Sequence, residues 1–271
     1  MFVSVTVDSC LTPVKQLTVN STQLTQAVSS SQNGGVTSQG IDSVGPLSEG
    51  PSYPEVWEQI RDRLGNDIVI GRLPPGTRLV EEELASSLGV SRGPVRRALA
   101  DLEYRGLLEV RARRGARVVK LTAKDVIDLY IAREAIESAS LASAEPHNIK
   151  ALIADISEAT DLLEQRHQEF NPTESIRADL RFHRLLVAAS ANGHLLRLWD
   201  YLADQVALTM ARVHSISPDE SATRGVGVTL GDHRLILDAL REEDLSSALG
   251  LLHSHLSRAR SIAAQEMQGG H

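Results

Sequence analysis

The chain contains little sulfur, few aromatic rings and no long apolar run. Its 271 residues include one cysteine, Cys10, and 3% of them are aromatic. A single cysteine excludes an intramolecular disulfide framework and a zinc site built on several cysteines. No apolar stretch approaches the roughly 18 residues of a membrane span, and the first residues lack the basic start and long apolar stretch of a signal peptide. We therefore expect a soluble, cytoplasmic protein that does not act at a membrane.

What the chain does contain favours helices. Apolar residues make up 42% of the sequence, and Leu, Ala, Val and Ile supply most of them. This balance favours packed helices over a β-sandwich or a barrel.

The charge is unevenly distributed along the chain. The net charge of −7 does not by itself indicate a nucleic-acid partner. However, residues 92–120 hold nine basic and three acidic side chains, whereas residues 122–271 hold 14 basic and 22 acidic ones. This asymmetry is typical of a phosphate-binding module joined to a separate acidic domain.

The N-terminal half of the chain has the element order of a winged helix-turn-helix. Residues 1–50, rich in Ser, Thr, Gln and Gly, predict a disordered tail. Apolar spacing predicts a helix over 53–71, a short helix over 81–88 and a third helix from Ser91 to Gly106. Two short strands follow, LLEV and ARVVK, joined by the basic turn RARRG. We expect this DNA-binding domain to cover residues 51–121.

Several arginines of this module are suited to DNA. Arg92 and Arg96 are four residues apart and therefore share one helix face. Guanidinium groups can bind guanine O6 and N7 bidentately. Arg111, Arg113 and Arg114 on the wing could lie along the minor groove or the phosphates. The alternative is that these arginines only solvate a helix face.

The chain beyond Leu121 is predicted to be helical throughout. A Thr-x-x-Asp pattern at Thr122 predicts a capping box at the start of the first helix, which stops at Pro146. Further helices are expected at roughly 147–168, 173–191, 193–215, 226–242 and 244–267. Their apolar stripes predict an antiparallel bundle over 122–268. The expected fold class is therefore mainly α, with an N-terminal winged helix-turn-helix and a small β-hairpin wing.

Four residues of the helical part are candidate ligands of a divalent metal. Asp179 and His183 leave one helix face, because they are i and i+4, while His233 and His255 lie in two later helices. One carboxylate and three imidazoles suit zinc, with nickel or another transition metal as alternatives. By spacing alone the signal is weak, because an i,i+4 Asp-His pair is more often a surface hydrogen bond.

Arg133 lies among apolar neighbours in the first helix of this domain. A buried arginine is costly without an anionic partner. One reading is a salt bridge to Glu134, Glu137 or another acid. The other is a clamp for the carboxylate of an effector beside the metal.

The N-terminal module resembles the GntR-type regulators. The resemblance lies in LPPGTRLVEEELA, in ELASSLGVSRGPVRRALADLEYRGLLEV and in RRGARV, and it covers residues 53–120. It implies a dimer on a palindromic double-stranded DNA site, with Arg92 and Arg96 at base edges. Arg97 stands where relatives are often acidic, and Gly93 stands where Thr is common. The expected DNA-binding set is Arg92, Gly93, Arg96, Arg97, Arg111, Arg113, Arg114 and Gly115.

The helical domain resembles the FCD type of effector domain. The matching pieces are LYIAREAIESASLA, ADLRFHRLLVAASANGHLL, DHRLILDAL and HSHL. Metal-binding members carry Asp-x-x-x-His and two later histidines, which fall on Asp179, His183, His233 and His255. His253 is the competitor for the last position. The resemblance also supports Arg133, with Asn192 beside it, as binding residues for a small organic acid.

Three functions compete at this point. The first is a transcription regulator, expected to be a repressor, whose operator affinity is controlled by the effector. The second is a constitutive DNA-binding protein with a purely structural metal. The third is a metal-dependent hydrolase, which is disfavoured because the chain has no HExxH motif, no Gly-x-Ser-x-Gly elbow and no Gly-rich phosphate loop. We therefore expect that the protein is not an enzyme.

Overall fold

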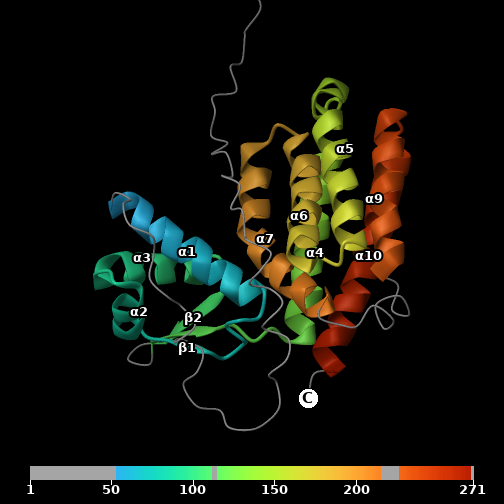
Figure 1. Ribbon diagram of the computed structural model, residues 1–271. Helices are drawn as coiled ribbons and strands as arrows, with labels where there is room; N and C mark the ends of the chain where they lie inside the picture. The colour runs from blue at the N-terminus through green and yellow to red at the C-terminus, as the bar shows by residue number, and fades with distance from the viewer. Residues whose placement is uncertain (1–52, 112–114, 215–225, 270–271) are drawn as a thin grey trace, which may run out of the picture. The chain divides into compact units, whose positions relative to one another are not determined.

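The computed structural model describes residues 53–111, 115–214 and 226–269 (Figure 1). The predicted tail at 1–50 and two of the wing arginines, Arg113 and Arg114, lie outside these residues.

The first part of the described chain forms a winged helix-turn-helix. Its elements in chain order are α1 (Tyr53–Val69), β1 (Arg78–Leu79), α2 (Glu81–Leu88), α3 (Arg92–Tyr104), β2 (Leu108–Arg111) and β3 (Gly115–Val118). The strands form an antiparallel sheet in the order β1-β3-β2, in which Leu108 is opposite Val118. Apolar side chains from α1, α2, α3 and the sheet share one core, which includes Ile60, Leu64, Leu84, Val95, Leu99 and Leu102.

The turn between α2 and α3 depends on a glycine. Gly89 ends α2 with φ = 68°, in the left-handed region, and its N–H bonds to carbonyls of the last turn of α2. Glycine adopts this conformation without the steric cost that a Cβ brings. Ser91 occupies the N-cap position of α3 as predicted, but its side chain makes no capping hydrogen bond.

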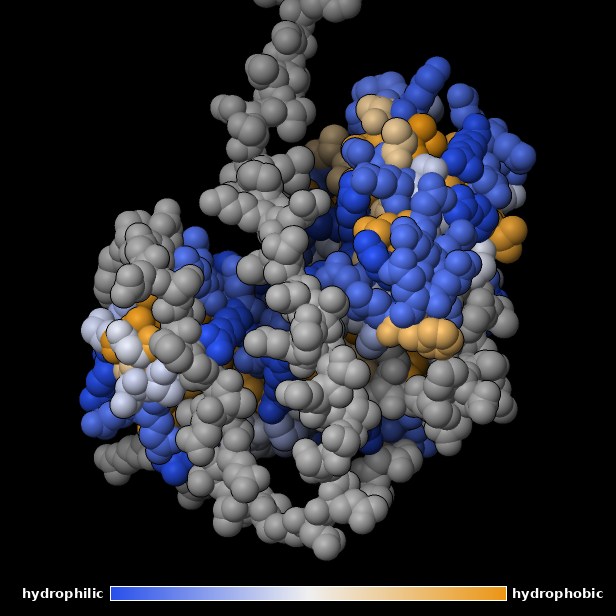
Figure 2. All heavy atoms as spheres, viewed as in Figure 1, coloured by the Kyte–Doolittle hydropathy of each residue, from blue (hydrophilic) through white to orange (hydrophobic). Residues whose placement is uncertain are grey.

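The second part of the described chain is a bundle of long helices. They are α4 (Ala123–Ala142), α5 (Pro146–Gln168), α6 (Pro172–Ala188), α7 (Gly193–His214), α9 (Val226–Arg241) and α10 (Leu245–Gly269). The apolar faces of α4, α5, α6, α9 and α10 meet in a core that includes Phe182, Leu186, Ile236, Leu252 and Leu256. Figure 2 shows a mainly hydrophilic outer surface over α5 and α9, as expected when apolar stripes turn inward.

The predicted fold class is confirmed, and so is the capping box predicted at Thr122. Thr122 and Asp125 form both hydrogen bonds of a capping box at the start of α4. Strand β1 was not predicted; it has only two residues and pairs with Arg117 and Ala116 of β3.

Candidate metal centre and DNA-reading helix

The structure brings the four predicted metal ligands together inside the bundle. Asp179 and His183 come from α6, His233 from α9 and His255 from α10. All four are buried, with exposed fractions between 0% and 6%. One potential ligand atom from each residue lies within 4.8 Å of the others. His253 does not belong to this cluster, because it is exposed and bonds to Glu134 instead.

The ligand atoms of the histidines are the Nε2 atoms, which converge. His183 Nε2 lies 3.3 Å from His233 Nε2 and 3.2 Å from His255 Nε2. Asp179 Oδ1 is 3.0 Å from His233 Nε2. Asp179 Oδ2 has no hydrogen-bond partner among the described residues, although it is buried. A buried acceptor left without a partner is costly, so the arrangement favours a cation at this point.

The electrostatics keep Asp179, His183 and His255 in the protonation states that bind metal. Burial lowers the pKa of His255 to about 3, and the neighbouring His233 adds to this effect. Burial and then the charge of Arg133 lower the pKa of His183. Burial alone would raise the pKa of Asp179, but His183, His233 and Arg133 together hold it well below its ordinary value. Neutral imidazoles and an ionised carboxylate are the forms that coordinate metal.

The residues present therefore fit a divalent metal. Three imidazole nitrogens and a carboxylate oxygen are the ligand types that zinc and other first-row transition metals take in proteins. A ligand set of nitrogen and oxygen atoms without cysteine is compatible with several of these metals. The geometry supports a metal site and leaves the metal's identity open.

Arg133 lies beside this cluster and bonds to one of the predicted acids. Its Nε donates to Glu137 Oε1 over 2.8 Å, and its Nη2 lies 3.7 Å from Asp179 Oδ2. The guanidinium also lies over the rings of Tyr130 and Trp199. Arg133 is only 1% exposed, yet its Nη2 has no hydrogen-bond partner among the described residues. The hydrogen bond to Glu137 uses one side of the guanidinium, while Nη2 has only the longer ion-pair contact with Asp179 and could still donate to an anion.

Two further carboxylates contact the other nitrogens of the candidate ligands. Glu137 Oε2 is 2.6 Å from His183 Nδ1, and both side chains are fully buried. Asp232 Oδ2 is 3.4 Å from His255 Nδ1, without the geometry of a hydrogen bond, and it accepts a hydrogen bond from Arg258. Carboxylates in such positions orient metal-binding histidines.

Asn192 is not brought to the cluster. It is exposed, and its Oδ1 accepts hydrogen bonds from the backbone N–H groups of His194 and Leu195 at the start of α7. A helix cap accounts for this side chain.

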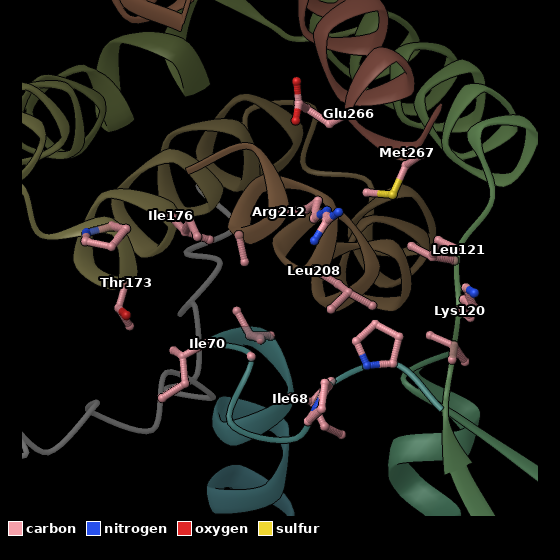
Figure 3. Close-up of a pocket in the computed structure, with 17 residues that line it drawn as sticks. Ile68, Ile70, Lys120, Leu121, Thr173, Ile176, Leu208, Arg212, Glu266 and Met267 are labelled. Carbon is pink, nitrogen blue, oxygen red and sulfur yellow. The ribbon is translucent and has the colours of Figure 1, made fainter. Parts of the chain in front are cut away.

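A mainly apolar hollow of about 470 Å³ lies elsewhere in the protein (Figure 3). Its walls include Ile68, Leu121, Ile176, Leu208 and Met267. None of the candidate metal ligands borders it, and neither does Arg133. The hollow is therefore a separate feature from the candidate metal centre.

Helix α3 presents two of its predicted arginines to solvent. The side chains of Arg92 and Arg96 are 58% and 66% exposed, and both pair with Glu81 at the start of α2. The shared carboxylate holds the two guanidinium groups on the same side of α3. Gly93 is exposed beside them.

Arg97 has a different environment. Its guanidinium lies 4.1 Å from the ring centroid of Trp57, which Arg61 also contacts at 5.1 Å. Trp57 is 8% exposed and belongs to α1. Arg97 is exposed like Arg92 and Arg96, but its guanidinium contacts α1, which distinguishes it from those two arginines.

Of the wing, the structure describes the two strands β2 and β3. Arg111 ends β2 and is paired with Gly115 of β3. Gly115 has φ = 77°, and a Cβ there would lie 3.3 Å from the carbonyl oxygen of Leu79. Both observations explain why a glycine is needed at the base of the wing.

Four residues that contact the candidate site residues were not predicted from the sequence. Asp232, Glu81, Trp57 and Trp199 were not singled out, and Glu137 was considered only as a salt-bridge partner of Arg133. The i,i+4 spacing of Arg133 and Glu137 was a usable signal. The remaining contacts join residues far apart in the chain, which no local pattern reveals.

Comparison with known proteins agrees with the two-part structure. Residues 57–118 match the family described as bacterial regulatory proteins, gntR family, and residues 128–258 match the FCD domain. The chain is 30% identical over 211 residues to the uncharacterized HTH-type transcriptional regulator YdhC of Bacillus subtilis, covering 76% of this chain and 88% of that protein. It is 27% identical over 213 residues to the gluconate operon transcriptional repressor of the same species, covering 75% and 86% of the two chains. Among solved structures, a GntR transcriptional regulator from Rhodococcus sp. RHA1 matches with a TM-score of 0.65 and 27% identity, covering 80% of this chain and 99% of that one.

The chain is therefore a DNA-binding transcriptional regulator, and it belongs to the GntR family with an FCD domain. Its relatives are regulators rather than enzymes, so the hydrolase alternative is not supported. No helix in the described part of the chain combines the length and apolar character needed to cross a membrane.

Proposed function

We propose that this regulator binds a palindromic operator as a homodimer and that a small carboxylate, held beside a divalent metal, controls its affinity for that operator. The DNA-binding domain covers 51–121 and the effector domain 122–268. Asp179, His183, His233 and His255 hold the metal, zinc being the first candidate and nickel an alternative. The protein acts as a repressor, as the name of its gluconate operon relative says of that protein.

The observation that carries the proposal is the buried Nη2 of Arg133 next to the four converging ligands. Arg133, Glu137 and Asp179 together bring one positive and two negative charges into the bundle, and the buried carboxylate of Asp232 is balanced by Arg258. The net charge of Arg133, Glu137 and Asp179 is −1. A divalent metal changes the net charge of the site to +1, and one bound carboxylate then brings it to zero. Burying an unbalanced charge is expensive, so metal and monoanion favour each other at this site. Bound there, the metal supplies a cation that a carboxylate oxygen can approach.

On the DNA side, Arg92 and Arg96 read base edges from α3. Gly93 lets the backbone approach the duplex, and the wing residues Arg111, Arg113, Arg114 and Gly115 follow the phosphates or the minor groove. The exposure of both α3 arginines supports this assignment.

Calorimetry tests the ligand side of the proposal. The protein is prepared once with one equivalent of zinc and once after chelation, and each form is titrated with a panel of small mono- and dicarboxylates. We expect one metal ion per chain and a monocarboxylate that binds only the metal-loaded form. Arg133→Gln should abolish carboxylate binding and retain the metal.

A structural metal is the second candidate, because the four ligands tie together α6, α9 and α10. It predicts that chelation unfolds the bundle and that no acid in the panel alters DNA binding. That pair of results would replace the sensor proposal by the structural one.

A further inference from the structure

One buried carboxylate serves two donors at the candidate metal centre. Glu137 is 0% exposed, and its oxygens face different side chains. Oε1 accepts from Arg133 Nε over 2.8 Å, while Oε2 lies 2.6 Å from His183 Nδ1. Because Arg133 can only donate and an ionised carboxylate can only accept, both bonds require that His183 carries its hydrogen on Nδ1.

This hydrogen determines what His183 presents to the other ligands. A neutral imidazole has one protonated nitrogen and one free lone pair. With the hydrogen on Nδ1, the lone pair is on Nε2, which lies within 3.3 Å of His233 and His255. The alternative tautomer would point an N–H into the same space and block coordination.

We propose that Glu137 is a positioning residue that fixes His183 in its metal-binding tautomer and anchors Arg133 with the same carboxylate. The inference rests on the metal part of the proposed function. Both bonds need two acceptor atoms on one side chain, which a carboxylate has and an amide lacks.

Glu137→Gln gives a specific expectation. The amide oxygen should stay with Arg133, because bonds to a charged donor are the stronger ones. The amide NH₂ then faces His183 Nδ1, which must become an acceptor, and the hydrogen moves to Nε2. Metal affinity should fall about 10- to 100-fold, the usual effect of removing a partner of a metal-binding histidine.

Glu134→Gln is the matched control on the same helix. Glu134 also bonds to a histidine Nδ1, that of the exposed His253, at 2.5 Å, but it does not contact the four ligands. This variant should change metal affinity by no more than about twofold.

The test has two readouts. Nitrogen-15 NMR of histidine-labelled, metal-free protein reports the tautomer of His183, assigned with a His183→Asn variant. Competition with a chelator reports the zinc affinity of wild type and variants. We expect the Nδ1–H form in wild type and in Glu134→Gln, and the Nε2–H form in Glu137→Gln. If Glu137→Gln does not fold, Glu137→Asp keeps two acceptor oxygens and should keep the Nδ1–H form.

An unchanged tautomer in Glu137→Gln, or an Nε2–H tautomer in wild type or in Glu137→Asp, overturns the inference. Failure of wild type to bind any divalent metal would instead overturn the metal part of the proposed function. The two failures are distinguishable, because the tautomer is measured without metal.

Discussion

Replacing Arg96 or Arg97 by Ala should separate base reading from packing on the same helix. Arg96 is 66% exposed and pairs with Glu81, so Arg96→Ala should cost at most about 1 kcal/mol of stability. If Arg96 contacts a guanine bidentately, its loss removes about 1–3 kcal/mol of discrimination, which is roughly 5- to 150-fold in operator affinity relative to a scrambled duplex. Arg97→Ala instead removes a guanidinium from Trp57, worth about 0.5–1 kcal/mol, and should lower stability while operator preference remains.

Fluorescence anisotropy measures this preference with a labelled operator, selected from random duplexes, and a scrambled duplex of equal length. Urea unfolding of the same variants measures stability. The assignment is refuted if Arg97→Ala abolishes operator preference while Arg96→Ala retains it.

Three other variants probe the helix start, the core and the wing. Thr122→Ala should lower the free energy of unfolding by about 1 kcal/mol. The hydrogen bond from Thr122 lowers the pKa of Asp125, so the stabilisation depends on the ionised carboxylate. Urea titrations should therefore show the full difference between wild type and variant above about pH 4, and a smaller difference as the pH falls below it. Leu252→Ala truncates a side chain that is 0% exposed and should lower the free energy of unfolding by about 2–5 kcal/mol in the same assay. A loss of less than about 1 kcal/mol would contradict the place of Leu252 in the core. Arg113→Ala should weaken binding to every duplex and reduce the slope of log affinity against log salt by about 1, whereas a changed base preference would mean that the wing reads sequence.

Most of the fold could be predicted because its signals are local. Apolar spacing and the breaks at glycine and proline locate the helices, and the capping box at Thr122 involves residues three apart. The β1 strand could not be found in this way. Its two residues, Arg78 and Leu79, are a strand only because they pair with Arg117 and Ala116.

The four candidate ligands of the metal centre could be named from the sequence, but the residues that contact them could not. The pair Asp179 and His183 is local, since i,i+4 residues share a helix face, and the resemblance supplied His233 and His255. The bond from His183 to Glu137 spans 46 residues, and the stack of Arg97 on Trp57 joins two helices. Such contacts depend on tertiary packing, which has no counterpart in sequence spacing.

The measurement that tests the central claim most directly is operator affinity as a function of metal and acid. Anisotropy titrations would use wild type and Arg133→Gln, each metal-loaded or chelated, with and without the carboxylate identified by calorimetry. The account predicts that the acid shifts the operator Kd of metal-loaded wild type by about 5- to 150-fold, the usual range of allosteric coupling, and leaves the other three forms unchanged. An equal shift in Arg133→Gln or in chelated protein, or no shift in any form, would contradict it.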